Sequence, residues 1–358
     1  MAPGIKINDR EIGLDHPTYF IADVAANHDG NLERAYHLIR LAKEAGADAA
    51  KFQNFQAPRI VSDYGFKHMD GGQVSHQATW KKSVFEVYQG ASIPFDWTPL
   101  LMEACREVGI DYFTSPYDFD AIEYVDTYIP AFKIGSGEID WIESLETIAR
   151  KGKPVLLATG ASDMGDVQRA VHAILAINPQ LVLMQCNTNY TANDENYDHI
   201  NLNVLKTYAS MFPQVVLGLS DHTHGPATVL GAVALGARVI ERHFTDDNGR
   251  DGPDHKFATN PQDWADMVAE TRKLERALGC ADKFVAENEK DTVVVQRRCL
   301  RAARNIKVGE TLTREMIDVL RPATPGAILP SHLLEVIGTK ALYDLAFGKE
   351  LRWTDLGS

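Results

Sequence analysis

The sequence predicts an α/β protein, a (β/α)8 TIM barrel followed by a small C-terminal domain. Between residues 19 and 278, eight short apolar segments are each followed by a segment with helical spacing of apolar residues. Several of the apolar segments are nearly continuous, as expected for parallel strands that are covered on both faces. Eight such units over about 260 residues match the size of a (β/α)8 barrel. A doubly wound open sheet is the alternative, but no glycine-rich dinucleotide fingerprint follows the first strand.

The expected elements alternate regularly along this part of the chain. We expect strands at residues 19–26, 47–52, 111–115, 131–134, 154–158, 181–185, 215–219 and 238–241. We expect helices at residues 32–45, 98–108, 118–127, 142–151, 163–177, 202–211, 226–235 and 261–278. A long polar loop from Ala57 to about Lys82 interrupts the alternation, and loops of that length are usually functional or disordered.

The pattern changes after Gly279, where charged residues replace the regular alternation. We therefore expect three parts, a barrel over residues 1–280, a linker over 281–292 and a small domain over 293–358. The small domain has about 65 residues, near the lower size limit for a chain that folds alone. Its strand-like pieces are V-V-V-Q (293–296), L-R-A-A-R (300–304) and L-R-W (351–353), and its expected helices are 314–318 and 332–336.

Composition narrows the class of protein. The chain has 358 residues, and its 49 acidic residues outnumber its 36 basic ones, giving a net charge of −13. That charge disfavours nonspecific binding to nucleic acid or to an anionic membrane. No apolar run of about 18 residues and no signal peptide is present, so we expect a cytoplasmic protein. The four cysteines form no C-x-x-C pair, which argues against a structural zinc site or a disulfide framework.

Polar side chains cluster where the predicted strands end. In a (β/α)8 barrel the active site lies at the carboxyl ends of the strands. The residues at or near these ends are Asp23, Asn27, Lys51, Gln53, Ser115, Lys133, Ser136, Glu138, Thr159, Asn187, Tyr190, Ser220, His222 and His243.

Two of these residues, Lys51 and Lys133, lie within apolar strands. Buried lysines are rare unless they are paired, so both require an anionic partner. One interpretation is a site for a phosphate or carboxylate, in which Ser115, Ser136 and the amides of residues 135–137 supply further donors.

Two other interpretations of the lysines stay open. They can pair with Asp23 and Glu138 in a structural ion network. Alternatively, one lysine can form a Schiff base with a carbonyl substrate, as in class I aldolases.

His222 and His243 end two successive predicted strands, and this pairing favours a metal site over simple packing. Two imidazoles without cysteine suit a labile site for Mn²⁺, Mg²⁺ or Zn²⁺, with water or substrate as the other ligands. Glu241 either points to the same side or belongs to an ion pair in the core. In the loop that follows, we expect Asp254 or His255 to reach over the barrel mouth.

Several motifs in this order resemble the sialic acid synthase (N-acetylneuraminate synthase) family, over nearly the whole chain. In the barrel the matching pieces are Ala22–Gly30, Ala50–Gln53, Thr114–Tyr117, Phe132–Glu138, Ala158–Gly160, Gly218–Thr223, Glu241–Thr245 and Gly252–Asp254. In the tail, Arg321–Gly326 is similar to part of that family's antifreeze-like (SAF, β-clip) domain.

The resemblance implies an activity and an assembly. Such enzymes condense phosphoenolpyruvate with an open-chain N-acetylmannosamine-like aldose, giving a nine-carbon 2-keto-3-deoxy sugar acid and phosphate. A divalent metal ion, most often Mn²⁺, is required. The resemblance also implies a domain-swapped homodimer, in which the small domain caps the partner's active site.

The matching motifs carry the family's roles onto residues of this chain. Phosphoenolpyruvate would be bound by Lys51, Ser115, Lys133, Ser136, Asn187 and Ser220. The sugar would be bound by Gln53, Tyr190, Asp254 and, from the partner chain, Arg321. The metal would be held by His222 and His243, which together with Asp23 and Glu138 form the catalytic set.

Three positions depart from the family pattern. Asp23 replaces the usual Glu, and Thr188 stands where an Asn is usual. The loop Gly71–Lys82 has no clear match where the family reads the sugar, which leaves the sugar open. A diacetamido-trideoxyhexose, the precursor of legionaminic or pseudaminic acid, is therefore the alternative substrate. A Schiff-base aldolase and a non-catalytic sugar-binding protein remain more distant alternatives.

Overall fold

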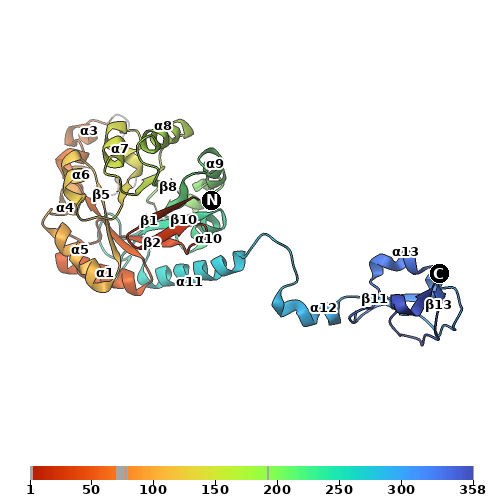
Figure 1. The fold of residues 1–358 in the computed structure, drawn as a ribbon. Coiled ribbons are helices and arrows are strands. Elements are labelled where there is room, and N and C mark those ends of the chain that lie inside the picture. Colours follow the sequence, from red (N-terminus) through yellow and green to blue (C-terminus); the bar gives the residue numbers. More distant parts are fainter. Residues whose placement is uncertain (1–2, 70–76, 78–79, 192, 358) are drawn as a thin grey trace. The chain divides into compact units, whose positions relative to one another are not determined.

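The computed structural model describes residues 3–69, 77, 80–191 and 193–357 (Figure 1). Contacts within the chain define two compact units, Met1–Gly279 and Cys280–Ser358. The first unit contains an eight-stranded parallel sheet and its helices, and the second contains two small antiparallel sheets. No helix in the described part of the chain is both long and apolar enough to cross a membrane.

The eight parallel strands form a nearly closed barrel, which confirms the predicted fold class (Figure 1). The strands are β3 (Tyr19–Asp23), β4 (Ala49–Asn54), β5 (Asp111–Pro116), β6 (Phe132–Ile134), β7 (Val155–Ala158), β8 (Leu181–Cys186), β9 (Val216–Asp221) and β10 (Ala237–His243). Their order is β5-β4-β3-β10-β9-β8-β7-β6, and the two end strands, β5 and β6, pack against each other.

Helices cover the outside of the barrel. The barrel helices are α1 (Leu32–Glu44), α5 (Trp97–Val108), α6 (Phe119–Val125), α7 (Ile142–Ala149), α8 (Met164–Leu175), α9 (Val204–Met211), α10 (Ala227–Ala234) and α11 (Pro261–Leu278). Local sequence sets several of their starts. The side chain of Asn31 accepts the amide of Arg34 at the start of α1, and Asp163 caps α8 in the same way.

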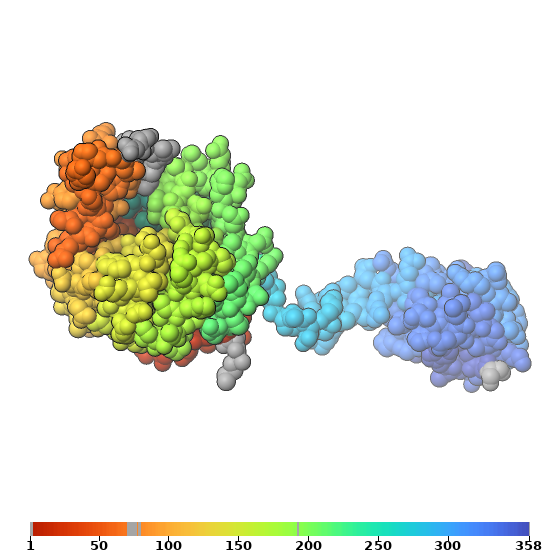
Figure 2. Space-filling view, turned by 90° about the horizontal axis from the view of Figure 1, so that it is seen from above, coloured from red at the N-terminus to blue at the C-terminus, as the bar shows by residue number. Residues whose placement is uncertain are grey.

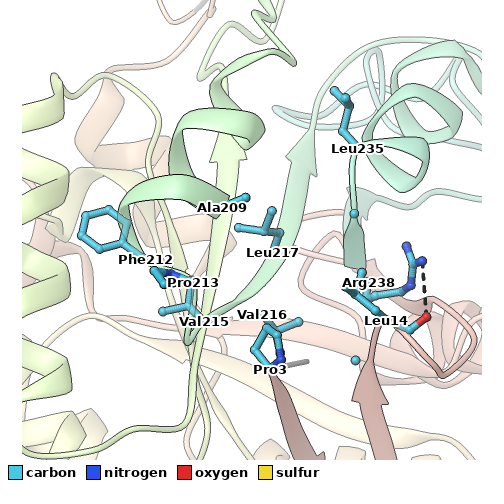
Figure 3. A pocket seen from close by; sticks show the side chains of 12 residues that line it. Pro3, Leu14, Ala209, Phe212, Pro213, Val215, Val216, Leu217, Leu235 and Arg238 are labelled. Atoms are coloured by element: carbon cyan, nitrogen blue, oxygen red, sulfur yellow. Dashed lines mark hydrogen bonds between the residues drawn. The ribbon is translucent and has the colours of Figure 1, made fainter. Parts of the chain in front are cut away.

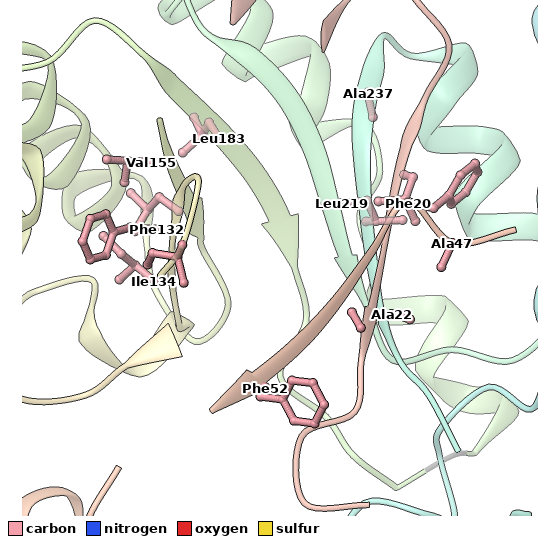
Figure 4. Packing of buried hydrophobic residues seen from close by; sticks show 14 of the residues in the cluster. Phe20, Ala22, Ala47, Phe52, Phe132, Ile134, Val155, Leu183, Leu219 and Ala237 are labelled. Atoms are coloured by element: carbon pink, nitrogen blue, oxygen red, sulfur yellow. The ribbon is translucent and has the colours of Figure 1, made fainter. Parts of the chain in front are cut away.

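Strict alternation along the strands separates two layers of side chains. Phe20, Phe52 and Phe132 point outward into the layer between strands and helices (Figure 4). Tyr19 and Phe113 point inward and pack with one another inside the barrel. Because side chains alternate along a strand, inward positions continue towards the carboxyl ends, where they become polar.

A hairpin that the sequence did not predict packs against this inner layer. β1 (Gly4–Ile7) and β2 (Arg10–Gly13) pair antiparallel. Their buried side chains Ile5, Ile7 and Ile12 belong to the same apolar cluster as the inward residues of the barrel strands. The hairpin therefore covers apolar side chains inside the barrel, away from the polar strand ends.

The segment expected as one long loop, 57–82, is partly helical. It contains α2 (Ala57–Ile60) and α3 (Asp63–Lys67), and α4 (Val84–Ala91) follows it. α4 begins with a capping box. The Ser83 hydroxyl oxygen accepts the backbone N–H of Glu86, and the Glu86 carboxylate accepts the backbone N–H of Ser83. The prediction of one long loop was wrong where α2 and α3 form, and at α3 the side chain of Ser62 accepts the amide of Gly65.

The second unit has its own small apolar core around Leu300, Ile306 and Val336. Its strands are β11 (Cys299–Ala302), β12 (Ile317–Leu320), β13 (Lys340–Ala341) and β14 (Leu356–Gly357), and its helices include α12 (Lys290–Gln296) and α13 (Leu333–Val336). Three expectations were wrong here. V-V-V-Q lies in α12, L-R-W lies in no strand, and the helix expected at 314–318 is a 3₁₀ turn, Arg314–Met316, followed by β12.

His28, in the loop after β3, is a fully buried histidine whose ring lies edge-on to that of Trp97, with centroids 5.7 Å apart. The amide of Gly30 donates to its Nδ1 at 3.0 Å, so Nδ1 carries no proton. Burial lowers the pKa of His28 to about 4. The folded protein therefore keeps this ring neutral at pH values where an unfolded chain protonates it.

We predict that this histidine makes the fold less stable as the pH falls from about 6.5 to about 4. The unfolded chain gains a proton over that range, and the folded chain does not. The urea midpoint of His28→Gln should therefore fall less between pH 7 and pH 4.5 than that of the wild type. The exposed His37→Gln is the control and should keep the wild-type slope. An unchanged slope in His28→Gln would contradict the assignment.

Candidate active site

A pocket of about 450 Å³ opens at the carboxyl ends of the barrel strands. Figure 2 shows the barrel unit hollowed between the orange segment around residues 50–70 and the green segment around residues 190–200. Six of the predicted site residues line the pocket, namely Gln53, Ser136, Glu138, Tyr190, His243 and Asp254. The strand ends thus bring together side chains that are far apart in the sequence.

Below the pocket, inside the barrel, two lysines pair with two carboxylates. Lys51 Nζ lies 2.6 Å from Asp23 Oδ2, and Lys133 Nζ lies 3.0 Å from Glu241 Oε1. Glu241 Oε2 is also 4.0 Å from Lys51 Nζ, so the two pairs form one network. The side chains of all four residues are at most 6% exposed. We call these four residues the charge network.

The charge network corrects one expectation. The partner of Lys133 is Glu241, whereas the ion-network interpretation named Glu138. Burial alone would raise the pKa of Glu241, but the ammonium groups of Lys133 and Lys51 lower it, so its carboxylate stays ionised. The Ser220 hydroxyl donates to the same carboxylate at 3.2 Å.

Glu138 occupies a different environment, in a 3₁₀ turn (Ser136–Glu138) directly after β6. It lines the pocket, and burial raises the pKa of its carboxyl group, although Lys133 opposes the shift. The same turn presents Ser136, whose hydroxyl accepts the amide of Gly160 at 2.9 Å. Ser115, in the inner layer, lies 3.5 Å from Lys51 Nζ.

The two histidines of the predicted metal site lie next to each other, with ring centroids 5.4 Å apart. His222 Nδ1 is 2.8 Å from the carbonyl oxygen of Asn187, so it donates there and leaves the Nε2 lone pair for a ligand. His243 Nε2 is 3.9 Å from Asp23 Oδ2.

This donor set fits a weakly held divalent ion. A bond from Nδ1 to a carbonyl is the usual support for a metal-ligating histidine. Among the described residues, no group of three or more His, Cys, Asp or Glu side chains is arranged to hold a metal. Two imidazoles therefore suit an ion whose other ligands come from water or substrate.

Asp254 completes the pocket beside the histidines. Its Oδ2 accepts the amide of Ala26 at 3.2 Å and lies 3.8 Å from His243 Nδ1. Burial raises the pKa of Asp254 to about 6, and the nearby Asp23 adds to the shift. Tyr190 packs edge-on against His222, with ring centroids 4.5 Å apart.

The structure does not bring every predicted residue into this pocket. Asn187 donates to the carbonyl of His199 at 3.2 Å and lines a neighbouring polar hollow of about 580 Å³. Thr188 lines both cavities. Arg321 belongs to the second unit, where its Nε donates to the carbonyl of Gln296.

Much of the loop Gly71–Lys82, which has no clear match to the family pattern, lies outside the described residues.

One side of the pocket was not predicted at all, an apolar wall from the helical segment after β4. We define the apolar wall as Phe55, Ile60, Val61, Phe66, Trp80, Val87 and Tyr88. Phe55 packs against both Tyr88 and Tyr117, with ring centroids 5.4 and 5.8 Å apart. No wall residue belongs to a motif that the sequence analysis identified, although the neighbouring Tyr117 belongs to the motif Thr114–Tyr117.

A second pocket of about 240 Å³ contains none of the predicted site residues (Figure 3). Its lining is almost entirely apolar and includes Leu14, Phe212 and Leu235, while Arg238 donates to the carbonyl of Leu14. It lies beside the hairpin, where strands β9 and β10 begin. We therefore assign the active site to the strand-end pocket.

Known proteins share this combination of a barrel unit and a small C-terminal domain. The NeuB family model matches residues 38–283, and the SAF domain model matches residues 297–357. The spore coat polysaccharide biosynthesis protein SpsE of Bacillus subtilis is 33% identical, with 98% of this chain and 96% of that protein covered. Its crystal structure superposes with a TM-score of 0.65 over 99% of both chains.

Two further relatives have names that state an activity. The N,N'-diacetyllegionaminic acid synthase of Legionella pneumophila is 31% identical, and 99% of each chain is covered. The N-acetylneuraminate-9-phosphate synthase of Homo sapiens is 32% identical, with 93% of this chain and 91% of that protein covered.

A parallel barrel with a strand-end site, followed by a SAF domain, is the architecture of a sugar-acid synthase. The chain belongs to the NeuB family, whose members include the sialic, legionaminic and pseudaminic acid synthases. The resemblance to sialic acid synthases is thereby confirmed. Enzymes of this family use phosphoenolpyruvate and an amino sugar and generally depend on a metal.

We predict that Glu241→Ala destabilises the fold by about 3–5 kcal/mol, because it leaves buried lysine charge without its partner. Urea unfolding measures the loss. Inorganic phosphate should raise the Tm of this variant more than that of the wild type, because the anion can replace the lost carboxylate.

The control for this prediction is Glu103→Ala, which removes an exposed partner of Arg106 and should change little. Equal stability of the two variants would show that the charge network contributes no more than a surface pair.

Proposed function

We propose that this protein condenses phosphoenolpyruvate with an open-chain, N-acylated aldose, releasing phosphate and a nine-carbon 2-keto-3-deoxy sugar acid. The observation that carries the proposal is that two buried lysines lie below the strand-end pocket, next to two adjacent histidines of which His243 lines it. Phosphoenolpyruvate is a small molecule with two anionic groups, and an aldose aldehyde needs activation. The lysines can bind the anionic groups, and a metal ion held by the histidines can activate the aldehyde.

Phosphoenolpyruvate would bind above the charge network. An ammonium group has three donors, so Lys51 and Lys133 can each hold a carboxylate of the protein and still bind a substrate oxygen. The hydroxyls of Ser115, Ser136 and Ser220 would supply further hydrogen bonds. Asn187 would contribute near this site as well, and its backbone carbonyl already accepts a hydrogen bond from His222 and so orients that ring.

The metal would be held by His222 and His243, and Mn²⁺ is our proposed ion. When bound, it supplies a Lewis acid that polarises the aldehyde oxygen. The protein's own part is to orient the imidazoles, as the carbonyl of Asn187 does for His222.

In the reaction, a bond forms between C3 of phosphoenolpyruvate and the aldehyde carbon. Water adds at C2, and the C2–O bond to phosphate breaks. Glu138, whose pKa is raised by burial, is suited to give a proton to the aldehyde oxygen. Asp23, held by Lys51 and by an amide N–H of Gln53 at 3.3 Å, would orient the water.

The rest of the sugar would contact Gln53, Tyr190 and Asp254. Arg321 would bind the N-acyl group from a partner chain, in a domain-swapped homodimer that works in the cytoplasm. This assembly assigns catalysis to residues 1–280, a linker role to 281–292 and the capping role to 293–358.

The apolar wall favours a particular sugar among the family's substrates. If the aldehyde carbon is at the histidines, the far end of the sugar meets Ile60, Phe66 and their neighbours. Among the described residues that line the pocket there is no lysine or arginine. A deoxygenated sugar end fits such a wall better than a phosphorylated one, which favours the diacetamido-trideoxyhexose alternative.

We predict phosphate release from phosphoenolpyruvate that depends on both an aldose and Mn²⁺ and stops with a chelator. His243→Ala should lower the rate by more than about a hundredfold while the Tm stays near that of the wild type. Borohydride trapping of a lysine adduct would instead support a Schiff-base aldolase. Sugar binding without phosphate release from any aldose would support a non-catalytic protein.

We also predict an order among aldoses. N-acetylmannosamine 6-phosphate should have a kcat/KM at least about tenfold below that of N-acetylmannosamine, because the wall offers its charge no partner. The 6-deoxy analogue should have a kcat/KM equal to or above that of N-acetylmannosamine. Ile60→Arg should reduce the difference in kcat/KM between the phosphorylated and the unphosphorylated sugar. The exposed Leu100→Arg should leave that difference unchanged. A preferred phosphorylated sugar in the wild type would refute the role of the wall.

A further inference from the structure

A fully buried histidine, His255, joins the two loops that follow the neighbouring strands β3 and β10. Its Nε2 lies 3.0 Å from Asp29 Oδ1 in the first loop, residues 24–31. Its Nδ1 lies 2.7 Å from Thr245 Oγ1 in the second loop, residues 244–260. Both ring nitrogens are therefore bonded, one to each loop.

These contacts define the tautomer of the ring. An ionised carboxylate only accepts hydrogen bonds, so Nε2 of His255 carries a proton and donates it to Asp29. The hydroxyl of Thr245 then donates to Nδ1, and its oxygen accepts the amide of Asp247 at 3.3 Å. Each ring nitrogen thus has its own partner, and neither nitrogen can be exchanged for the other without losing a bond.

Arg34 in α1 strengthens the same junction. Its Nε donates to the carbonyl of Asn27 at 2.7 Å and lies 3.0 Å from Asp29 Oδ2, with which the guanidinium forms an ion pair. Its two terminal nitrogens bind Asp246 in a fork, at 2.9 and 2.6 Å. We call the connected group the loop latch, consisting of Asp29, Arg34, Thr245, Asp246 and His255.

The latch acts directly on the segment that carries Asp254. A Cβ atom on Gly252 would lie only 2.6 Å from Cδ2 of His255, so the backbone there packs against the ring. Asp254 immediately precedes His255 and turns its carboxylate into the pocket, where Oδ2 accepts the amide of Ala26. Moving the His255 ring would therefore move Asp254.

We propose that His255 is a positioning residue, which holds the aldose-binding carboxylate of Asp254 in place through the loop latch. The inference rests on the proposed function, because it assigns Asp254 to the sugar. A carboxylate that is already ordered loses less freedom when the sugar binds. Lys51 and Lys133 lie on strands outside the latch, so phosphoenolpyruvate binding should not depend on it.

Two substitutions separate the two ring contacts. His255→Gln places an amide donor where Nε2 was and can keep the bond to Asp29, whereas His255→Asn can reach only Thr245. We expect His255→Asn to raise the KM for the aldose about tenfold, with the KM for phosphoenolpyruvate changed less than about twofold. His255→Gln should restore the aldose KM to within about threefold. The control is His37→Asn, at an exposed position, and it should keep the wild-type KM values for both substrates.

Hydrogen exchange gives a readout that needs no activity. Amides in residues 246–258 should exchange faster in His255→Asn than in the wild type. If His255→Asn fails to fold, Asp29→Ala replaces it, because Asp29 is 33% exposed and its removal breaks the same contact. Equal rises in both KM values, or unchanged aldose KM and exchange, would overturn the proposal. A wild type that releases no phosphate would refute the proposed function, and the exchange result would still test the latch.

Discussion

The pairing of Lys51 with Asp23 and of Lys133 with Glu241 is the interaction on which the rest of this structure depends. Each buried charge would cost several kcal/mol without its partner. The four residues come from four different strands, β3 and β4 for one pair and β6 and β10 for the other. Only a curved sheet with the correct register can bring all of them into one inner layer. The same arrangement holds two ammonium groups under the pocket before any substrate arrives.

Much of the barrel could be predicted because its signals are local. Apolar runs of the right length, each followed by helical spacing, identified all eight strands and the helices that cover them. α11 has the bounds that the sequence predicted, since Asn260 and Pro261 mark its start and Gly279 its end. Strand-end positions also followed from the chain, and six of the predicted site residues line one pocket.

What could not be predicted depends on contacts between distant segments. The choice of Glu241 over Glu138 as partner of Lys133 follows from the curvature of the sheet, which no spacing in the sequence encodes. The apolar run at 293–296 suits a strand as well as a helix, and its assignment depends on whether another strand is beside it. The hairpin and the apolar wall were not predicted, because each is recognised only by its contacts with parts of the chain that are distant in sequence.

The apolar wall has a further consequence. All of its residues come from the one stretch between β4 and α5, whereas the charged groups come from the barrel strands themselves. Exchange of that single stretch could therefore alter which sugar fits and leave the lysines and histidines in place. A fold divided in this way lets related enzymes diverge in specificity through insertions and deletions, at little cost to the chemistry that they share.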